Sequence, residues 1–146
     1  MSRPSTRERG STLVLTIGYA AFALVVVLVV AAATSLYIER KRLLGLADSA
    51  ALVGAEAFDL SEVTVDPDRG VRVTLDPGAV EEAVTGFVAR AGPTQFEDLR
   101  ITRATSSDGR SATVTLRSAW RPPVLTLLLP DGLALEATST ARSVLR

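Results

Sequence analysis

Side chains able to perform chemistry are scarce in this sequence. The chain contains no cysteine and no histidine, and Lys41 is its single lysine. Thiol nucleophiles, cysteine-based zinc sites and imidazole proton transfer near neutral pH are therefore excluded. Paired carboxylates are the main remaining route to catalysis. We expect a protein that is not an enzyme and that binds no cofactor.

Five carboxylates lie close together in the sequence and are candidates for a calcium site: Glu56, Asp59, Glu62, Asp66 and Asp68. Their spacing does not fit the Asp-rich calcium loop, because Arg69 and Gly70 interrupt the repeat. Proline and glycine among them indicate turns instead. The sequence therefore predicts no metal site.

Two further classes of ligand are disfavoured. The 16 Lys and Arg balance 16 Asp and Glu, so the chain lacks the basic excess of a nucleic-acid-binding protein. Serines have no histidine to activate them, and no glycine-rich phosphate loop is present. Trp120 is typical of a strand end or packing site. We expect neither nucleic acid nor a small-molecule substrate.

A long uncharged stretch runs from Ser11 to Ile38, and its centre reads AAFALVVVLVVAAA. As a helix it would extend about 42 Å, more than the roughly 30 Å hydrocarbon core of a bilayer. A buried strand or core helix would have a much shorter apolar run. The stretch is therefore predicted to cross a membrane once.

A cleaved signal peptide is the alternative to a permanent anchor. Three arginines among the first ten residues supply a basic start, and Ala31–Ala33 could form a small-residue cleavage site. The apolar stretch is longer than that of a signal peptide, however, and continues through Tyr37. We expect an uncleaved anchor, with a secreted module released near Ala33 as the alternative.

The flanking charges do not decide the orientation, since three arginines precede the span and Arg40, Lys41 and Arg42 follow it. The longer part of the chain lies after the span, and long domains can be translocated regardless of charge. We expect the N-terminus in the cytoplasm and the C-terminal domain outside it.

The helix is predicted to continue past the membrane, because Glu39–Phe58 has no proline and is rich in alanine and leucine. Small residues recur there at four-residue spacing, as Ala47, Ala51 and Ala55 do. Such spacing lets another helix approach closely. Two alternatives stay open: contact with a partner helix, or packing on the chain's own domain.

From Leu60 onward the apolar residues alternate as in strands, and a turn at Asp66–Gly70 indicates a hairpin. Asp76 is expected to cap a helix that begins at Pro77 and ends at Gly92. Further strands are expected at three ranges: Leu99–Arg103, Ala112–Trp120 and Leu133–Val144. Val124–Leu129 fits either a short helix or an edge strand.

These elements predict an α+β fold: a long N-terminal helix, then a small antiparallel sheet of about five strands with one packed helix. The expected divisions are a basic cytoplasmic tail (1–10), a transmembrane helix (11–38), an extracytoplasmic helical extension (39–59) and an extracytoplasmic α+β domain (60–146).

The segment around the end of the span resembles a known family. Leu36-Tyr37, the basic Arg40-Lys41-Arg42 and the run Leu46-Ala-Asp-Ser-Ala-Ala-Leu-Val-Gly-Ala55 are similar to the N-terminal module of TadE/TadG-like proteins. These proteins belong to the tight-adherence (Flp, type IVc) pilus apparatus of bacteria. The small residues of Ala137–Ala141 also resemble the closing strand of such proteins.

The resemblance implies a candidate prepilin-type processing site between Gly10 and Ser11. In the family pattern a glutamate is the fifth residue after that glycine, and this chain has Leu15 there. A charge within a span is tolerated when it pairs with a neighbouring chain, which leucine cannot do. We therefore expect the chain to remain uncleaved.

The resemblance also implies a role: a TadG-like or minor pseudopilin-like component of a Flp pilus or related secretion apparatus in the bacterial inner (cytoplasmic) membrane. Its expected partners are membrane lipid and pilus-assembly or pilin-like helices, including its own copies. The expected helix-packing residues are Gly45, Ala47, Asp48, Ala51, Gly54 and Ala55. A secreted binding module around Trp120 and an anchored carboxylate enzyme are the alternative classes.

Overall fold

The computed structural model describes residues 8–57, 64–66, 70–72, 74–92, 94–122 and 131–142. It divides the chain into an N-terminal unit, Met1–Tyr37, and a C-terminal unit, Ile38–Arg146. The elements in order are α1 (Glu8–Ala55), β1 (Thr64–Asp66), β2 (Gly70–Arg72), α2 (Pro77–Ala91), β3 (Glu97–Thr105), β4 (Ser111–Trp120) and β5 (Leu133–Arg142). The expected long helix, from near Ser11 to near Phe58, is thus present as α1.

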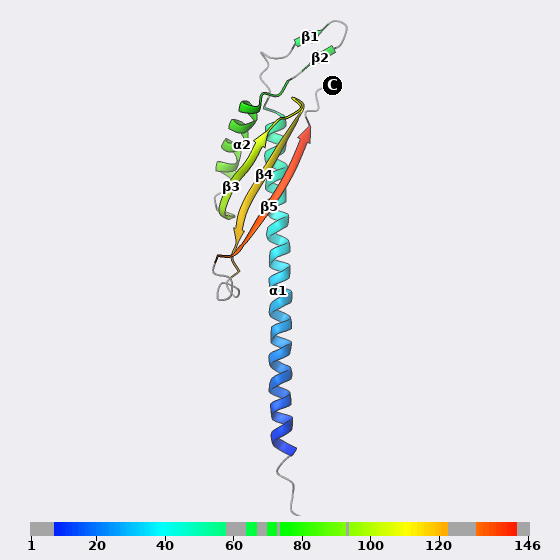
Figure 1. The fold of residues 1–146 in the computed structure, drawn as a ribbon, viewed down its shortest axis with the longest axis vertical. Helices are drawn as coiled ribbons and strands as arrows, with labels where there is room; N and C mark the ends of the chain where they lie inside the picture. The colour runs from blue at the N-terminus through cyan, green and yellow to red at the C-terminus, as the bar shows by residue number, and fades with distance from the viewer. Residues whose placement is uncertain are drawn as a thin grey trace, which may run out of the picture. The chain divides into compact units, whose positions relative to one another are not determined.

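The sheet of the C-terminal unit is antiparallel, with strand order β3-β4-β5 (Figure 1). The expectation of about five strands in one sheet is wrong, because among the described residues the sheet has three. β1 and β2 pair with each other around the expected turn and form a separate two-stranded hairpin. Each has only three residues, too few to extend a sheet of nine- and ten-residue strands. Val124–Leu129, and Val144 at the expected end of the last strand, lie outside the described residues.

α2 begins and ends where its capping residues predict. The Asp76 carboxylate accepts a hydrogen bond from the backbone N–H of Ala79 at 2.9 Å, and Pro77 occupies the first turn. At the other end the backbone N–H of Gly92 donates to the carbonyl of Val88. Val80, Val84 and Val88 form the buried side of the helix. The capping residues thus determine the two ends of this helix, and the spacing of its apolar residues determines which side faces inward.

The core of the C-terminal unit forms where α1, α2 and β4 meet. Alternate residues of β4, Ala112, Val114 and Leu116, are buried on the side that faces the helices. Their outward neighbours form the other face, where the hydroxyls of Thr113 and Thr140 lie 3.1 Å apart. The sheet thus has one apolar face against helices and one polar face, as in other α+β folds.

The turn between β3 and β4 is held by the Asp108 carboxylate. It accepts hydrogen bonds from the backbone N–H groups of Arg110, at 2.9 Å, and Ser111, at 2.7 Å, and from the Ser111 hydroxyl at 2.9 Å. These bonds stabilise the ionised form and lower the pKa of Asp108 from its ordinary value of 3.8 to about 2. The same turn supports the core, since the Gly109 carbonyl accepts a hydrogen bond from the buried Leu75.

This depressed pKa predicts an acid-sensitive contribution to stability. Because Asp108 binds a proton more readily when unfolded, its contribution is present above pH 3.8 and is lost as the pH falls toward 2. Thermal melts of the wild type and of Asp108→Asn should therefore differ clearly near neutral pH and converge as the pH falls toward 2. A constant difference in melting temperature across this range would contradict the assignment.

Candidate functional site

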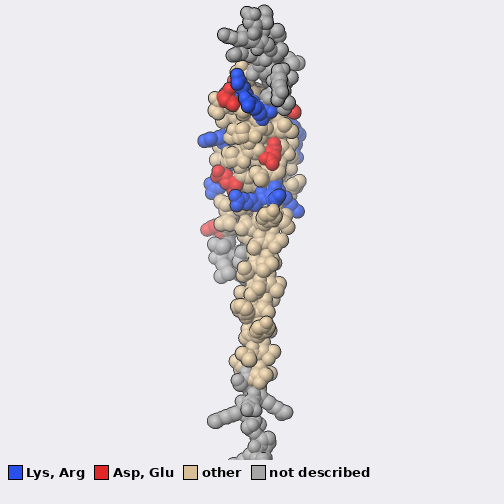
Figure 2. Space-filling model, turned by 90° about the vertical axis from the view of Figure 1, so that its right-hand side faces the viewer, with Lys and Arg blue, Asp and Glu red and all other residues tan. Residues whose placement is uncertain are grey.

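The described residues of the N-terminal unit form a helix that presents apolar side chains on every side. Leu15, Tyr19 and Phe22 are 73%, 75% and 65% exposed. An 18-residue window of α1 reaches a mean hydropathy of 2.8 with none of its residues buried. Figure 2 shows this part of α1 without charged side chains. By length and composition, α1 is able to cross a membrane, and a soluble protein rarely exposes so much apolar surface.

Two threonine hydroxyls in this part of α1 donate to backbone carbonyls of the same helix. The Thr16 hydroxyl donates to the carbonyl of Thr12 at 2.8 Å, and the Thr34 hydroxyl donates to the carbonyl of Val30 at 2.9 Å. An unsatisfied polar group is costly in hydrocarbon, and these bonds remove that cost. Thr16 and Thr34 are therefore compatible with an apolar surrounding.

Four of the six expected helix-packing residues are buried inside the C-terminal unit. Ala47 and Ala51 are fully buried, Ala55 is 1% exposed, and Gly54 is also buried. A Cβ added at Gly54 would lie 3.1 Å from Ala112 Cβ and 3.1 Å from Val84 Cγ2. These small residues thus bring α1 close to α2 and β4 of the same chain. Packing on the chain's own domain, the second alternative from the sequence, is what these four residues do.

The other two residues of that set, Gly45 and Asp48, lie on the opposite, exposed side of α1. A Cβ at Gly45 would meet no atom within 4 Å. Leu44 and Leu52 flank them and are 40% and 51% exposed. An uncovered side of α1 in the C-terminal unit therefore combines a glycine with two exposed leucines.

The remaining sequence candidates are not brought together. Gly10 and Ser11 both lie within α1, close to its beginning at Glu8. Of the five clustered carboxylates, Asp66 pairs with Gly70 across the hairpin, whereas Asp59, Glu62 and Asp68 lie outside the described residues. Among the residues that are described, no three metal-ligating side chains come close enough to hold an ion.

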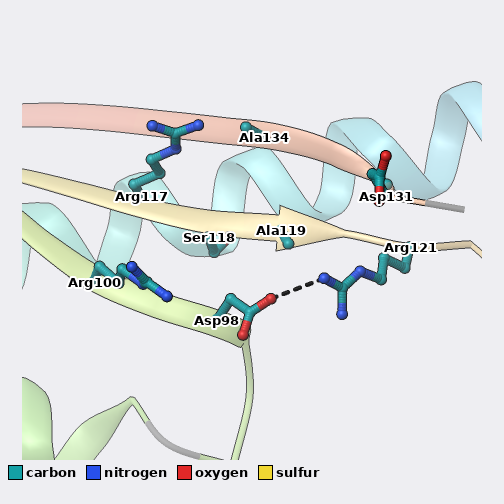
Figure 3. Close-up of a pocket in the computed structure, with 9 residues that line it drawn as sticks. Asp98, Arg100, Arg117, Ser118, Ala119, Arg121, Asp131 and Ala134 are labelled. Carbon is teal, nitrogen blue, oxygen red and sulfur yellow. Dashed lines mark hydrogen bonds and ion pairs between the residues drawn. The ribbon is translucent and has the colours of Figure 1, made fainter. Parts of the chain in front are cut away.

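Sequence reasoning missed a pocket at the end of β4 that is ringed by arginines (Figure 3). Arg121 donates to the Asp98 carboxylate at 2.9 Å and also lies 3.6 Å from Glu97. Arg100 and Arg117 stand directly opposite each other on β3 and β4. The available signal was the alternation of arginine with apolar residues on both strands, although two register shifts in β3 hide which arginines become neighbours.

The family comparison concerns α1. Residues 10–57 match the family model described as "Putative Flp pilus-assembly TadE/G-like". This chain carries a TadE/G-like segment. No curated protein and no solved structure gives a significant match.

The TadE/G-like segment, residues 10–57, covers about a third of the chain and coincides with α1 from Gly10 to its end. The resemblance inferred from the basic residues and the alanine-rich run is thereby confirmed. α2 and the sheet lie beyond the match. The similarity to this putative Flp pilus-assembly family is thus confined to residues 10–57.

The two glycines of the TadE/G-like segment that lie in the C-terminal unit allow a matched test of its packing. Gly54→Leu should lower the free energy of unfolding by about 1–3 kcal/mol, because the side chain would overfill the contact with Val84 and Ala112. Gly45→Ala should raise it by about 0.5–1 kcal/mol, since alanine favours the helix and has free space there. Equal effects in chemical denaturation would contradict this packing.

Proposed function

We propose that this protein is a non-enzymatic, membrane-anchored component of a Flp pilus-assembly system or a related secretion apparatus. The observation that carries the proposal is the coincidence of the TadE/G-like segment with one helix whose first part is uncharged and exposed. The helix crosses the bacterial inner membrane once, with the N-terminus in the cytoplasm and the C-terminal unit outside. In this role the helix itself is the functional element.

The proposed anchor is the uncleaved helix, because the fifth residue after Gly10 is Leu15 and not the glutamate of the family pattern. Leu15 offers no charge to pair with a neighbouring chain in a filament, which favours a permanent assembly factor over a pilus subunit. Ala33, where a signal peptidase would cut, lies inside α1. The protein therefore keeps its entire N-terminal helix in this proposal.

The anchoring proposal predicts the intact mass of the protein purified from its native membrane. The mass should correspond to the full chain, and the protein should resist alkaline carbonate extraction because hydrophobic burial holds it in the bilayer. A chain that begins at Ser11 would indicate prepilin-type processing and a pseudopilin role. A chain that begins near Thr34 and is released in soluble form would contradict the proposal.

The partners proposed for the anchor are other membrane helices of the apparatus or further copies of this chain. Two surfaces of α1 serve this contact: the uncharged stretch within the membrane, and the exposed side formed by Leu44, Gly45, Asp48 and Leu52. Gly45 lets a partner backbone approach, and the leucines supply apolar area. Asp48 offers a carboxylate to a partner arginine. Ala47, Ala51, Gly54 and Ala55 serve the fold instead.

A substitution on this exposed side should separate assembly from folding. Leu52→Asp should weaken co-purification of partner helices about tenfold, since it replaces a contacting aliphatic group by a charge. Its melting temperature should stay close to that of the wild type, because Leu52 is half exposed. The matched control is Thr85→Asp, on the exposed side of α2. Unchanged co-purification by Leu52→Asp, or an equal loss with the control, would contradict the assignment.

A further inference from the structure

The arginine pocket lies on the polar face of the sheet, at the end of β4. Its volume is about 480 Å³, and its lining residues are Asp98, Arg100, Arg117, Ser118, Ala119, Arg121, Asp131, Gly132 and Ala134. Ala119, Gly132 and Ala134 have almost no side chain, so they leave a hollow between longer polar side chains. Figure 3 shows arginines from β3, β4 and the residue after β4 arranged around this hollow.

Two of these arginines face each other across neighbouring strands. Arg100 and Arg117 are cross-strand partners, and neither makes an ion pair or a side-chain hydrogen bond within the described part of the chain. Glu136 is opposite Arg117 on β5 but forms no ion pair with it. Like charges directly opposite each other destabilise a sheet. An anion bound between the two guanidinium groups would remove this repulsion.

The third arginine is held in place by unusual backbone. Asp98, which accepts from Arg121, has a positive φ of 51° and lies at a register shift between Glu97 and Arg100. On the other side, Gly132 has a φ of 70°, and a Cβ there would lie 2.5 Å from Arg121 Cγ. The Asp98 carboxylate is thus engaged by Arg121, and the second lining carboxylate, Asp131, forms no ion pair with Arg100 or Arg117 among the described residues.

The pocket lies level with the first charged residues of α1. The side chains of Leu99 in β3 and Leu46 in α1 both lie within 4 Å of the position that a Cβ at Gly92 would take. β3 therefore lies near α1 at the level of Leu46. Arg100 follows Leu99, and Leu46 is one helical turn beyond Arg42. Arg40, Lys41 and Arg42 come almost directly after the uncharged stretch of α1. The pocket and this basic group therefore lie at the same end of the C-terminal unit.

We infer that the arginine pocket, through Arg100 and Arg117, binds the phosphate of an anionic phospholipid in the membrane that α1 crosses. The inference rests on the proposed anchoring, under which Arg40–Arg42 lie at the bilayer surface. Arginine forks match the geometry of phosphate oxygens, and each basic residue near an anionic surface adds attraction. The head of the protein thereby gains a second attachment to the bilayer, independent of the apolar helix.

Residues at the same end of the sheet favour lipid over an acidic protein partner. Trp120 immediately precedes Arg121 and, by the alternation of β4, lies on the helix-facing side of the sheet; its cross-strand partner Leu133 is 45% exposed. Tryptophan is enriched where a protein meets the bilayer surface, because its ring is apolar and its N–H is polar.

The single tryptophan of the chain provides a direct test. The full-length protein is reconstituted into phosphatidylcholine vesicles that contain increasing fractions of phosphatidylglycerol brominated near the headgroup end of its acyl chains. Quenching of Trp120 fluorescence then reports approach of this end of the sheet to the anionic lipid. In the Arg100→Gln/Arg117→Gln variant, the phosphatidylglycerol fraction that gives half-maximal quenching should rise at least about fivefold.

The matched control is Arg142→Gln, which removes an exposed arginine from the other end of the same sheet, opposite Ser111. It should leave the quenching curve unchanged. Equal curves for the wild type and the double variant would overturn the inference, as would quenching by brominated phosphatidylcholine that equals quenching by the brominated anionic lipid. So would loss of the wild-type quenching on addition of inorganic phosphate or of an acidic peptide, because either soluble anion would then be the preferred ligand.

Failure of this inference can be told apart from failure of the anchoring. If the protein floats with the vesicles and resists carbonate but Trp120 is not quenched, the anchor stands and the lipid site is disproved. If the protein does not remain with the vesicles at all, the anchoring itself fails, and the lipid site fails with it.

Discussion

α1 can lie in van der Waals contact with both α2 and β4 because its buried side consists largely of alanine and glycine. The space at Gly54 is so narrow that one added methyl group would lie 3.1 Å from both neighbours. Larger residues at Ala47, Ala51 or Ala55 would separate the helix from the sheet and open the core. The close approach therefore determines where the sheet lies, and with it the position of every residue on the outer face.

The composition of α1 changes along its length, as the proposed membrane anchoring requires. Over the uncharged stretch the apolar residues occupy all sides, which suits a surrounding that is apolar in every direction. Beyond Glu39 the buried side consists mainly of small residues, while charged residues and the exposed Leu44 and Leu52 occupy the rest. The TadE/G-like match spans both parts of the helix.

The sequence was sufficient for the elements that have strong local signals. The long helix, the capped α2 and the antiparallel strands follow from periodicity, from Asp76 and Gly92, and from turn residues such as Asp108-Gly109. The number of strands in the sheet could not be predicted, since alternation over Thr64–Arg72 does not reveal which strand pairs with it. Likewise, small residues along α1 predict a close contact but do not specify its partner. The arginine pocket depends on β3 register shifts and on a positive φ at Asp98, and neither has a local signal.

The burial of the α1 small residues also bears on the order in which the protein forms during synthesis. Residues 43–55 leave the ribosome well before β4, the strand that covers them, has been made. Until β4 has been made, the apolar side of this helical segment is exposed to water. Because this side is mostly alanine and glycine rather than leucine, the uncovered area is small and offers chaperones and neighbouring nascent chains little to hold. The composition that permits close packing in the finished protein thus also protects its unfinished form.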